Sequence, residues 1–269
     1  MPRATAREPL ITLTTDFGLE DHFVGTMKGV ILSIAPRARI VDITHQVSPF
    51  EIAQGGFLLA AAAGYFPPKT VHVAVVDPGV GTSRHPIVVE SGGQYFVAPD
   101  NGLLSMIYER GKCTVRAATA RRYMLDEVSA TFHGRDVFAP IAAHLATGTS
   151  PARLGKRIDD YLRSEFHKPV HTGKRIWTGA ILHIDHFGNI VTNFHAAEFA
   201  DLATRPFAMT VGFERTSRLA STYGELHPGE LALVAGSTGY YEIVYNQASA
   251  AKLLGVSIGA PIELSRMSV

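Results

Sequence analysis

The sequence predicts an α/β N-terminal domain with a mainly parallel sheet, followed by a C-terminal all-β domain that forms a small barrel. In the N-terminal half, apolar β-branched runs alternate with segments of helical period, as in strands joined by crossover helices. Beyond residue 176 only short strand-like runs remain. Between these parts, residues 166–175 combine Pro, Gly and basic residues without a helical period. We therefore predict an N-terminal domain over 1–165, a linker over 166–175 and a C-terminal domain over 176–269.

The first five predicted elements alternate between strand and helix. They are a strand from Leu10 to Asp16, a helix from Asp21 to Pro36, a strand over Ile40–Thr44, a helix from Ser48 to the prolines at 67 and 68, and a strand from Val71 to Asp77. This order implies a parallel sheet covered by helices. Two of its strands end in a carboxylate, Asp16 and Asp77.

A hairpin and two helices complete the predicted N-terminal domain. They are a hairpin of 86–90 and 95–98 around Ser91-Gly-Gly-Gln94, a helix over 103–111 and a helix over 137–146. His133 then lies just outside a helix N-terminus, where backbone N–H groups and the helix dipole favour anions.

Five short runs define the predicted C-terminal domain. They are residues 178–184, 190–194, 207–211, 230–234 and 241–245. Two polar, glycine-bearing loops accompany them, Asp185–Asn189 and Gly236–Tyr240. The first carries a carboxylate, an aromatic ring and an amide, a set suited to binding a base or an amino-acid zwitterion. Because Asp, Gly and Asn are also turn residues, an ordinary hairpin turn explains it equally well.

Composition excludes several classes of protein. The formal net charge is +1 and no basic block occurs, which argues against nucleic acid and membrane surfaces as partners. The longest apolar stretch, Gly55 to Phe66, is too short to span a bilayer, and the N-terminal residues do not form a signal peptide. The single cysteine, Cys113, excludes an intramolecular disulfide and favours a cytoplasmic location.

The stretch from Val71 to Arg84 is the first candidate for chemistry. A buried strand delivers Asp77 to a turn in which Pro78 fixes φ and Gly79 and Gly81 permit positive φ, while Arg84 returns toward the acid. Ligands of open α/β sheets bind outside the carboxyl ends of strands, which is where Asp77 falls. An acid that simply opens a surface turn is the alternative.

Other familiar motifs do not fit this chain. Asp16-Phe17-Gly18 occurs without the Gly-rich loop and the catalytic loop of a kinase. Gly79-Val-Gly81 is not followed by the Gly-Lys-Ser/Thr of a phosphate-binding loop or by the third glycine of a dinucleotide fingerprint. The Gly-x-Ser-x-Gly elbow of α/β-hydrolases does not occur. The histidines show no zinc-site spacing, so we expect no metal site.

Six motifs, in order along the chain, resemble the S-adenosylmethionine (SAM) hydroxide adenosyltransferase family, relatives of SAM-dependent fluorinase and chlorinase. They are Thr15–Gly18, Val76–Thr82 with Arg84, Ala98–Leu103, Phe132–Asp136, Asp185–Asn189 and Ser237–Tyr240. The resemblance covers Leu10 to Leu264. It implies a homotrimer whose active sites lie between the N-terminal domain of one subunit and the barrel of the next.

The resemblance also implies roles for individual residues. Asp77, Arg84 and His133 match the groups that direct water onto C5′ of SAM, which releases adenosine and methionine. For substrate binding, Asp16 matches a ligand of the ribose hydroxyls, Phe50 a ribose wall, Asp185 and Ser237 the methionine-binding groups, and Phe187 and Asn189 residues near adenine. No cofactor or metal is implied, because SAM is itself the substrate.

Departures from the halogenases favour hydroxide transfer. The fluorinase has a tyrosine where this chain has Asp77, and an inserted loop where this chain has only Ser91-Gly-Gly-Gln94. A carboxylate beside the reacting carbon would repel a halide and accept a proton from water. Thr238 replaces an arginine of the fluorinase, which leaves the contacts to the amino acid open. The alternatives are a SAM-dependent halogenase and a SAM or adenosine sensor that does not catalyse.

Overall fold

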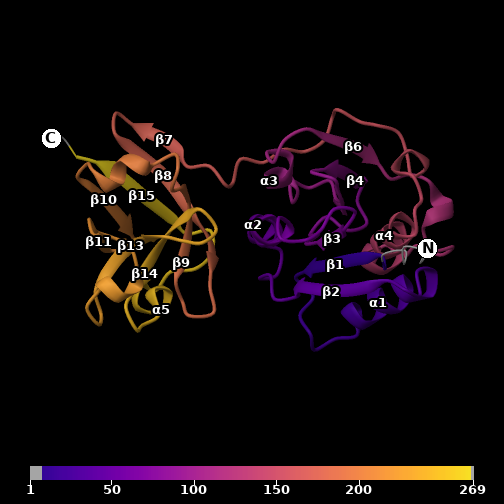
Figure 1. The fold of residues 1–269 in the computed structure, drawn as a ribbon, viewed down its shortest axis with the longest axis horizontal. Coiled ribbons are helices and arrows are strands. Elements are labelled where there is room, and N and C mark those ends of the chain that lie inside the picture. Colours follow the sequence, from indigo (N-terminus) through magenta and orange to yellow (C-terminus); the bar gives the residue numbers. More distant parts are fainter. Residues whose placement is uncertain (1–7, 268–269) are drawn as a thin grey trace, which may run out of the picture. The chain divides into compact units, whose positions relative to one another are not determined.

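The computed structural model describes residues 8–267 of the chain, which divides into two compact units, 1–164 and 165–269 (Figure 1). Each unit has its own apolar cores, so each is described by itself. Among the helices of residues 8–267, none combines the length and the apolar character needed to cross a bilayer.

The first unit contains one sheet and the helices that cover it. Its strands are β1 (Leu10–Thr15), β2 (Arg39–Thr44), β3 (Val71–Val75), β4 (Pro86–Ser91), β5 (Gln94–Pro99) and β6 (Cys113–Ala117). Its α-helices are α1 (Phe23–Ile34), α2 (Ile52–Ala63), α3 (Ser105–Tyr108) and α4 (Ala139–Ala146), with short helical turns at Arg121–Tyr123, Gly134–Phe138 and Pro151–Arg153.

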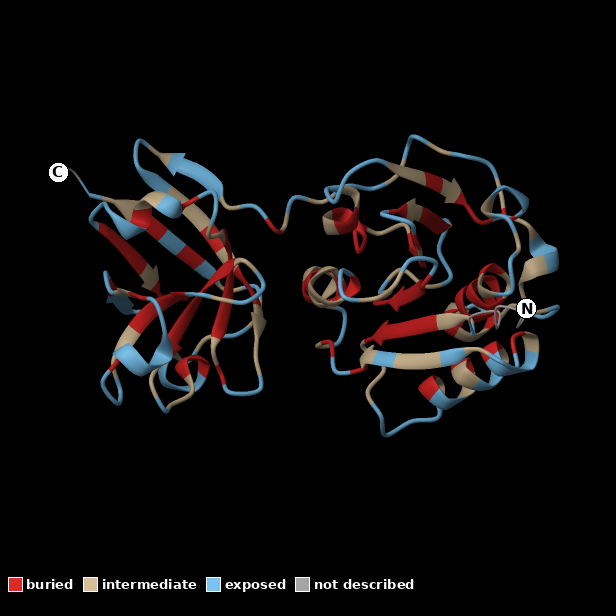
Figure 2. Cartoon of the chain, viewed as in Figure 1, coloured by how far each residue is buried: buried red, intermediate tan, exposed pale blue. Residues whose placement is uncertain are grey.

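The sheet has the order β2-β1-β3-β5-β4-β6 and is mainly parallel, as predicted. Strands β2, β1, β3 and β5 run parallel, while β4 is antiparallel to both β5 and β6. Alternate residues of the central strands face opposite layers. Val73 and Val75 join the core that contains α1 and α4, and Ala74 and Val76 join the core that contains α2 and α3. Burial on both faces explains the nearly continuous apolar runs of these strands, which are red in Figure 2.

Local contacts shift several predicted boundaries. Helix α2 begins at Ile52 instead of Ser48, because Phe50 has a positive φ of 70° that a helix does not accommodate. The helix predicted over 137–146 starts three residues earlier with a single π-turn, Gly134–Phe138. Of the two glycines expected to allow positive φ after Asp77, Gly81 has a φ of +80° and Gly79 does not use this freedom. The predicted hairpin is confirmed, and both glycines of its turn have positive φ.

The second unit is all-β apart from short helical segments. Its strands are β7 (Val170–Gly173), β8 (Ile176–Ile184), β9 (Ile190–His195), β10 (Phe207–Val211), β11 (Glu214–Thr216), β12 (Leu219–Ala220), β13 (Leu231–Ala235), β14 (Tyr240–Tyr245) and β15 (Pro261–Arg266). Helix α5 (Ala250–Leu254) and helical turns at Ala200–Ala203 and Tyr223–Glu225 lie between them.

These strands form one curled sheet, a half-barrel, with the order β11-β10-β15-β8-β9-β14-β13-β12 and β7 added beside β8. The hydroxyl of Thr216 in β11 donates to the carbonyl of Leu231 in β13 at 2.9 Å, so the two ends of the sheet approach each other. The predicted all-β class is confirmed. Strands β7, β11, β12 and β15, and β6 of the first unit, were not predicted.

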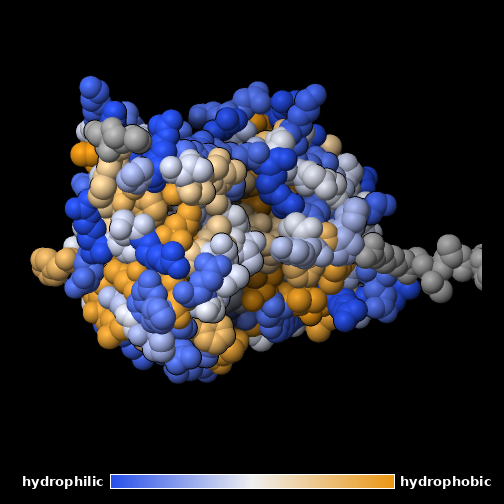
Figure 3. Space-filling view, turned by 60° about the vertical axis from the view of Figure 1, so that its left-hand side comes forward, coloured by the Kyte–Doolittle hydropathy of each residue, from blue (hydrophilic) through white to orange (hydrophobic). Residues whose placement is uncertain are grey.

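Exposed apolar side chains of the second unit include Phe187 and Phe213. On the face shown in Figure 3, hydrophobic areas are interrupted by hydrophilic side chains. Scattered exposed apolar residues of this kind are ordinary for a folded domain and do not by themselves mark a docking face.

Candidate active site

Two carboxylates leave the same edge of the first sheet. Strands β1 and β3 are parallel neighbours in which Thr15 pairs with Val75, and each strand is followed closely by an acid. Asp16 and Asp77 therefore emerge at adjacent carboxyl ends, where open α/β sheets bind ligands. The positions of both acids follow from the strand pattern.

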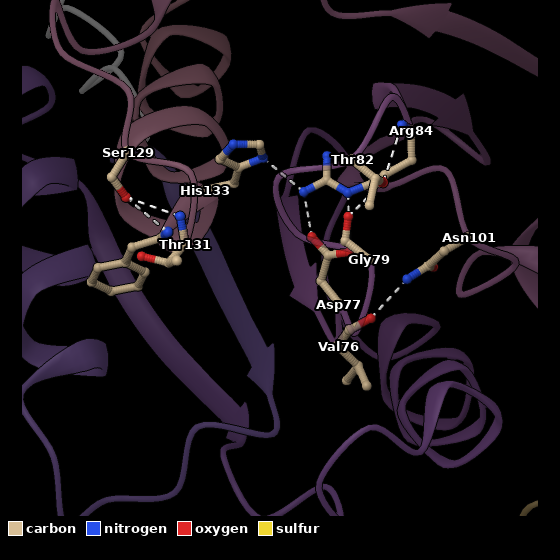
Figure 4. Close-up of polar contacts among 10 residues, drawn as sticks. Val76, Asp77, Gly79, Thr82, Arg84, Asn101, Ser129, Thr131 and His133 are labelled. Carbon is tan, nitrogen blue, oxygen red and sulfur yellow. Dashed lines mark hydrogen bonds and ion pairs between the residues drawn. The ribbon is translucent and has the colours of Figure 1, made fainter.

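The loop after β3 folds Arg84 back onto Asp77 (Figure 4). Arg84 Nε donates to Asp77 Oδ1 at 3.0 Å, and Arg84 Nη2 donates to Asp77 Oδ2, so the pair is bidentate. The side chains are only 9% and 4% exposed, respectively. A bidentate pair removed from water is strong and fixes the orientation of both groups.

His133 joins this pair through the same guanidinium. Arg84 Nη2 lies 2.8 Å from His133 Nδ1, and Figure 4 shows the ring facing the arginine from the turn before α4. Because arginine has only donors, Nδ1 must be the acceptor, which assigns the neutral tautomer with its proton on Nε2. Burial, and then the charge of Arg84, lower the pKa of His133 below its ordinary 6.5. The ring is therefore neutral at pH 7 and presents an N–H donor at Nε2.

Two neighbouring segments hold the loop in place. The amide of Asn101 donates to the carbonyl of Val76 at 2.8 Å, directly before Asp77. On the other side, a Cβ added to Gly81 would lie 2.5 Å from the carbonyl oxygen of Ala130. The loop thus packs closely against the segment that leads to His133, and Gly81 is the residue that permits this approach.

A cavity of about 270 Å³ opens beside these groups. Asp16, Phe50, Asp77 and His133 line it. Arg84 lies behind Asp77 and does not line it, although its Nη1 is buried and has no acceptor among residues 8–267. Most of the rest of the wall is apolar and includes aromatic rings, among them Phe17 and Phe132, whose centroids are 5.9 Å apart in an edge-to-face arrangement. An apolar wall with a few convergent polar groups is typical of a small-molecule site.

The charged side chains that line the cavity are acids, and Arg84 behind the wall balances the charge of one of them, Asp77. Asp16 and Asp77 are its acids, and no Lys or Arg is among the described residues that line it. Burial raises the pKa of Asp16, with a further contribution from the charge of Asp77, against the lowering effect of the Phe50 N–H. That N–H donates to Asp16 Oδ2 at 3.0 Å, which links the strained backbone of Phe50 to the acid. Such a cavity favours a cationic ligand.

The remaining predicted binding residues lie together in the second unit. Asp185, Phe187, Asn189 and Ser237 line a cavity of about 640 Å³. The loop Asp185–Asn189 is also a hairpin turn: Asp185 Oδ1 accepts from the backbone N–H groups of Phe187 and Asn189 at 2.9 and 2.8 Å, and its Oδ2 accepts from the Asn189 side chain at 2.9 Å. The hairpin-turn interpretation of this loop is confirmed, and its role in binding a ligand stays a prediction.

Sequence reasoning missed residues in both cavities. Phe17 and Phe132 stand inside motifs that were recognised, but they were not assigned to the wall. Tyr223 and Glu242 of the second cavity were also missed. The available signal for Glu242 was a lone acid inside an otherwise apolar strand run, Tyr240–Tyr245.

In residues 8–267, no three or more His, Cys, Asp and Glu side chains converge in a way that could hold a metal ion.

The fold and the site together define a two-unit protein, α/β and then β, in which a half-buried Asp–Arg–His network lies beside a cavity at the ends of parallel strands. Comparison with known sequences specifies the family. Residues 11–155 match the SAM hydroxide adenosyltransferase N-terminal domain, and residues 179–263 match the corresponding C-terminal domain. The chain belongs to this family.

Several known proteins are similar over nearly the whole chain. A protein from Salinispora tropica named (R)-S-adenosyl-L-methionine hydrolase is 40% identical to this chain, and the alignment covers 94% of this chain and 97% of that protein. A protein of that name from Methanocaldococcus jannaschii is 37% identical, with 95% of each covered. The crystal structure of an uncharacterized conserved protein from Thermotoga maritima superposes with a TM-score of 0.85 at 39% identity, covering 96% of this chain and 100% of that one. Proteins named fluorinase match at 24–28% identity.

Proposed function

We propose that this protein hydrolyses S-adenosyl-L-methionine to adenosine and L-methionine. The observation that carries the proposal is the half-buried Asp77–Arg84–His133 network beside a cavity whose charged lining residues are acids. The relatives named for SAM hydrolysis support the same reaction. SAM carries a sulfonium cation, which matches the sign of this cavity.

In the proposed reaction a water oxygen attacks C5′ in line with the bond to sulfur. The C–O bond forms as the C–S bond breaks, the bond pair leaves with methionine, and the water proton must be accepted. Asp77 is the acceptor that the geometry favours, because the guanidinium already occupies His133 Nδ1, whereas Asp77 is a carboxylate that faces the cavity. Arg84 fixes Asp77, and His133 Nε2–H orients the water. Holding oxygen, carbon and sulfur in line supplies a large part of the rate, on the order of 7–11 kcal/mol.

The substrate contacts remain a proposal built on the two cavities. Asp16 would bind the ribose hydroxyls and Phe50 would cover the ribose. In the second cavity Asp185 and Ser237 would bind the amino-acid part, and Phe187 and Asn189 would lie near adenine. The mechanism requires neither a metal nor a cofactor, because a carboxylate suffices to activate the water. We further propose a cytoplasmic homotrimer in which each SAM molecule contacts two subunits.

The decisive experiment is incubation with SAM in ¹⁸O-labelled water, followed by chromatography and mass spectrometry. We expect adenosine that carries one ¹⁸O at the 5′ position, together with unlabelled methionine. Both sulfonium epimers should be tested separately, because the hydrolase relatives are named for the (R) form. Absence of adenosine with either epimer would overturn the proposal.

A halogenase is the second candidate, because fluorinases are among the relatives. Asp77 argues against it, since a carboxylate on the cavity wall opposes the entry of a halide. Adding chloride or fluoride to the reaction should give no 5′-halogenated nucleoside. The third reading, a sensor, predicts tightly retained adenosine without turnover, which the same chromatogram would reveal.

A further inference from the structure

The second cavity contains a buried acid to which the proposed function assigns no role. Glu242 lies on β14 and is 7% exposed, yet it lines the cavity beside Asp185. The hydroxyl of Tyr223 donates to Glu242 Oε2 at 2.8 Å. The other carboxylate oxygen, Oε1, packs against Gly236, where an added Cβ would come within 2.0 Å of it. Tyr223 and Gly236 thus fix the carboxylate directly beneath the loop that carries Ser237.

This acid has no cation to balance it. None of the described residues that line the cavity is Lys, Arg or His. The charge of Asp185 raises the pKa of His183, but burial lowers this pKa by more, so the His183 ring is neutral at pH 7. Burial raises the pKa of Glu242; the Tyr223 hydroxyl opposes this effect, and the charge of Asp185 adds to it. Two carboxylates that share one cavity disfavour each other's charge until a cation enters between them.

We propose that Glu242 and Asp185 together bind the α-ammonium group of the substrate, with Tyr223 as the residue that positions Glu242. This inference rests on the proposed function and deepens it, because it makes recognition of a free amino group a requirement of the second cavity. A charged donor between two carboxylates satisfies both acids at once. An arginine that could bind the substrate carboxylate does not line this cavity within the described residues, so the ammonium group is the end of the amino acid that these residues recognise.

The test compares two sulfonium substrates, SAM and its deamino analogue, which keeps the sulfonium and the carboxylate but lacks the α-amino group. Wild-type enzyme should prefer SAM. The isosteric variant Glu242→Gln should lower kcat/KM for SAM by about ten- to a hundredfold, because losing a hydrogen bond between charged groups weakens binding by about this factor. Its kcat/KM for the deamino analogue should stay within about twofold of wild type. The preference for SAM would therefore collapse.

A purely structural role for Glu242 predicts a different result, an equal loss with both substrates, and that would overturn the inference. An unchanged preference would overturn it as well. Glu198→Gln is the matched control, because Glu198 is an exposed acid of the same unit that does not line the cavity. It should leave both substrates unaffected. Tyr223→Phe should reduce the preference in the same direction by a smaller factor.

Calorimetry keeps this inference separate from the reaction. L-Methionine should bind to wild-type protein more tightly than 4-(methylthio)butanoate, and Glu242→Gln should remove the difference. If neither sulfonium compound is hydrolysed, the proposed function fails while this binding result still decides the role of Glu242. Equal binding of the two ligands to wild-type protein would contradict an ammonium site.

Discussion

Arg84 is the residue that connects the polar groups of the first cavity. It binds both oxygens of Asp77 and the Nδ1 atom of His133, and the aromatic ring of Phe138 lies 5.3 Å from its Cζ atom. Because one guanidinium serves both partners, neither can move without breaking a charge-assisted hydrogen bond. In the proposed reaction this arrangement makes Asp77 the base and His133 the donor, a division of roles that the sequence alone left open.

Asp77→Asn tests the assignment of the base. The amide keeps the size of the side chain but cannot take the proton from water, so we expect kcat to fall by about 10²- to 10⁴-fold. Adenosine should still bind, which calorimetry would show, since no nucleoside contact is lost. Asp126→Asn, an exposed acid of the same unit, is the control. Turnover of Asp77→Asn at the wild-type rate would remove Asp77 from the mechanism.

The pH profile tests the protonation state of His133. Burial and Arg84 lower its pKa, so His133 stays neutral as the pH falls to 6.5 and gains a proton only below that value. Activity that needs neutral His133 should therefore be lost on the acid side with a midpoint below pH 6.5. In His133→Asn, the amide oxygen can still accept a hydrogen bond from Arg84. The loss of activity on the acid side of the profile, the acid limb, should then move to lower pH, because only carboxylates remain to titrate there.

His144→Asn is the matched control for this profile. Burial also lowers the pKa of His144, but this ring lies on α4, contacts Tyr123 and does not line the cavity. Its replacement should leave the acid limb in place. An acid limb that moved in His144→Asn and stayed in His133→Asn would show that a different histidine controls the rate.

At the scale of single residues, sequence reasoning succeeded where a strand end determined the position. Asp16 and Asp77 follow neighbouring parallel strands, so their proximity was a consequence of the fold class. Glu242 could not be placed in the same way. Its role depends on Tyr223, nineteen residues away in sequence, and on the space that Gly236 leaves. A lone acid in an apolar strand could mark Glu242 as unusual, but its contacts arise from tertiary packing, so its place in the cavity could not be predicted.

The loop between β3 and β4 is the element on which the site depends. Gly81→Ala should displace it, because the new Cβ would meet the Ala130 carbonyl at 2.5 Å and φ is +80°. Since a shift of about 1 Å can cost two orders of magnitude, we expect kcat to fall by about a hundredfold. Gly92→Ala isolates the backbone strain, because Gly92 has a φ of +56° and open space around its Cβ position.

Gly92→Ala should lower the free energy of unfolding by about 1–2 kcal/mol, because alanine is strained in the left-handed conformation, while kcat stays at the wild-type value. Urea denaturation and steady-state kinetics of both variants provide the comparison. Equal kinetics in Gly81→Ala and Gly92→Ala would show that the loop position does not matter for the reaction.

For helices and strands with a strong hydrophobic period, the sequence predicted the order and the type of the elements. It did not predict their exact ends. Helix α2 begins late because Asp16, distant in sequence, accepts the N–H of Phe50 and holds it at positive φ. Strand β6 is the edge strand of the first sheet and pairs with β4, and β15 lies between β8 and β10. Such short strands exist because a sheet partner is present, so their own residues give little indication of them.

At the scale of the whole molecule, the proposed homotrimer makes a quantitative prediction. Asp77→Asn damages the first unit and Asp185→Ala damages the second, so each variant alone should be inactive. If every site combines the first unit of one subunit with the second unit of another, random mixing of equal amounts leaves about one quarter of the sites without either lesion. Co-expression of the two variants with different tags should therefore restore up to about a quarter of the wild-type activity.

Light scattering on the purified mixture should give the mass of three chains. Tandem purification through both tags retains only mixed trimers, in each of which one site of three escapes both lesions, so this fraction should show about one third of the wild-type activity. A monomeric mass, or mixed trimers without activity, would contradict sites shared between subunits. Co-expression of Asp77→Asn with a second first-unit variant, His133→Ala, is the matched control. Both lesions then lie in the same unit, so every first unit carries one of them and no recovery is expected. Restoration by the first pair and not by the second would assign the two cavities to one site built from two subunits.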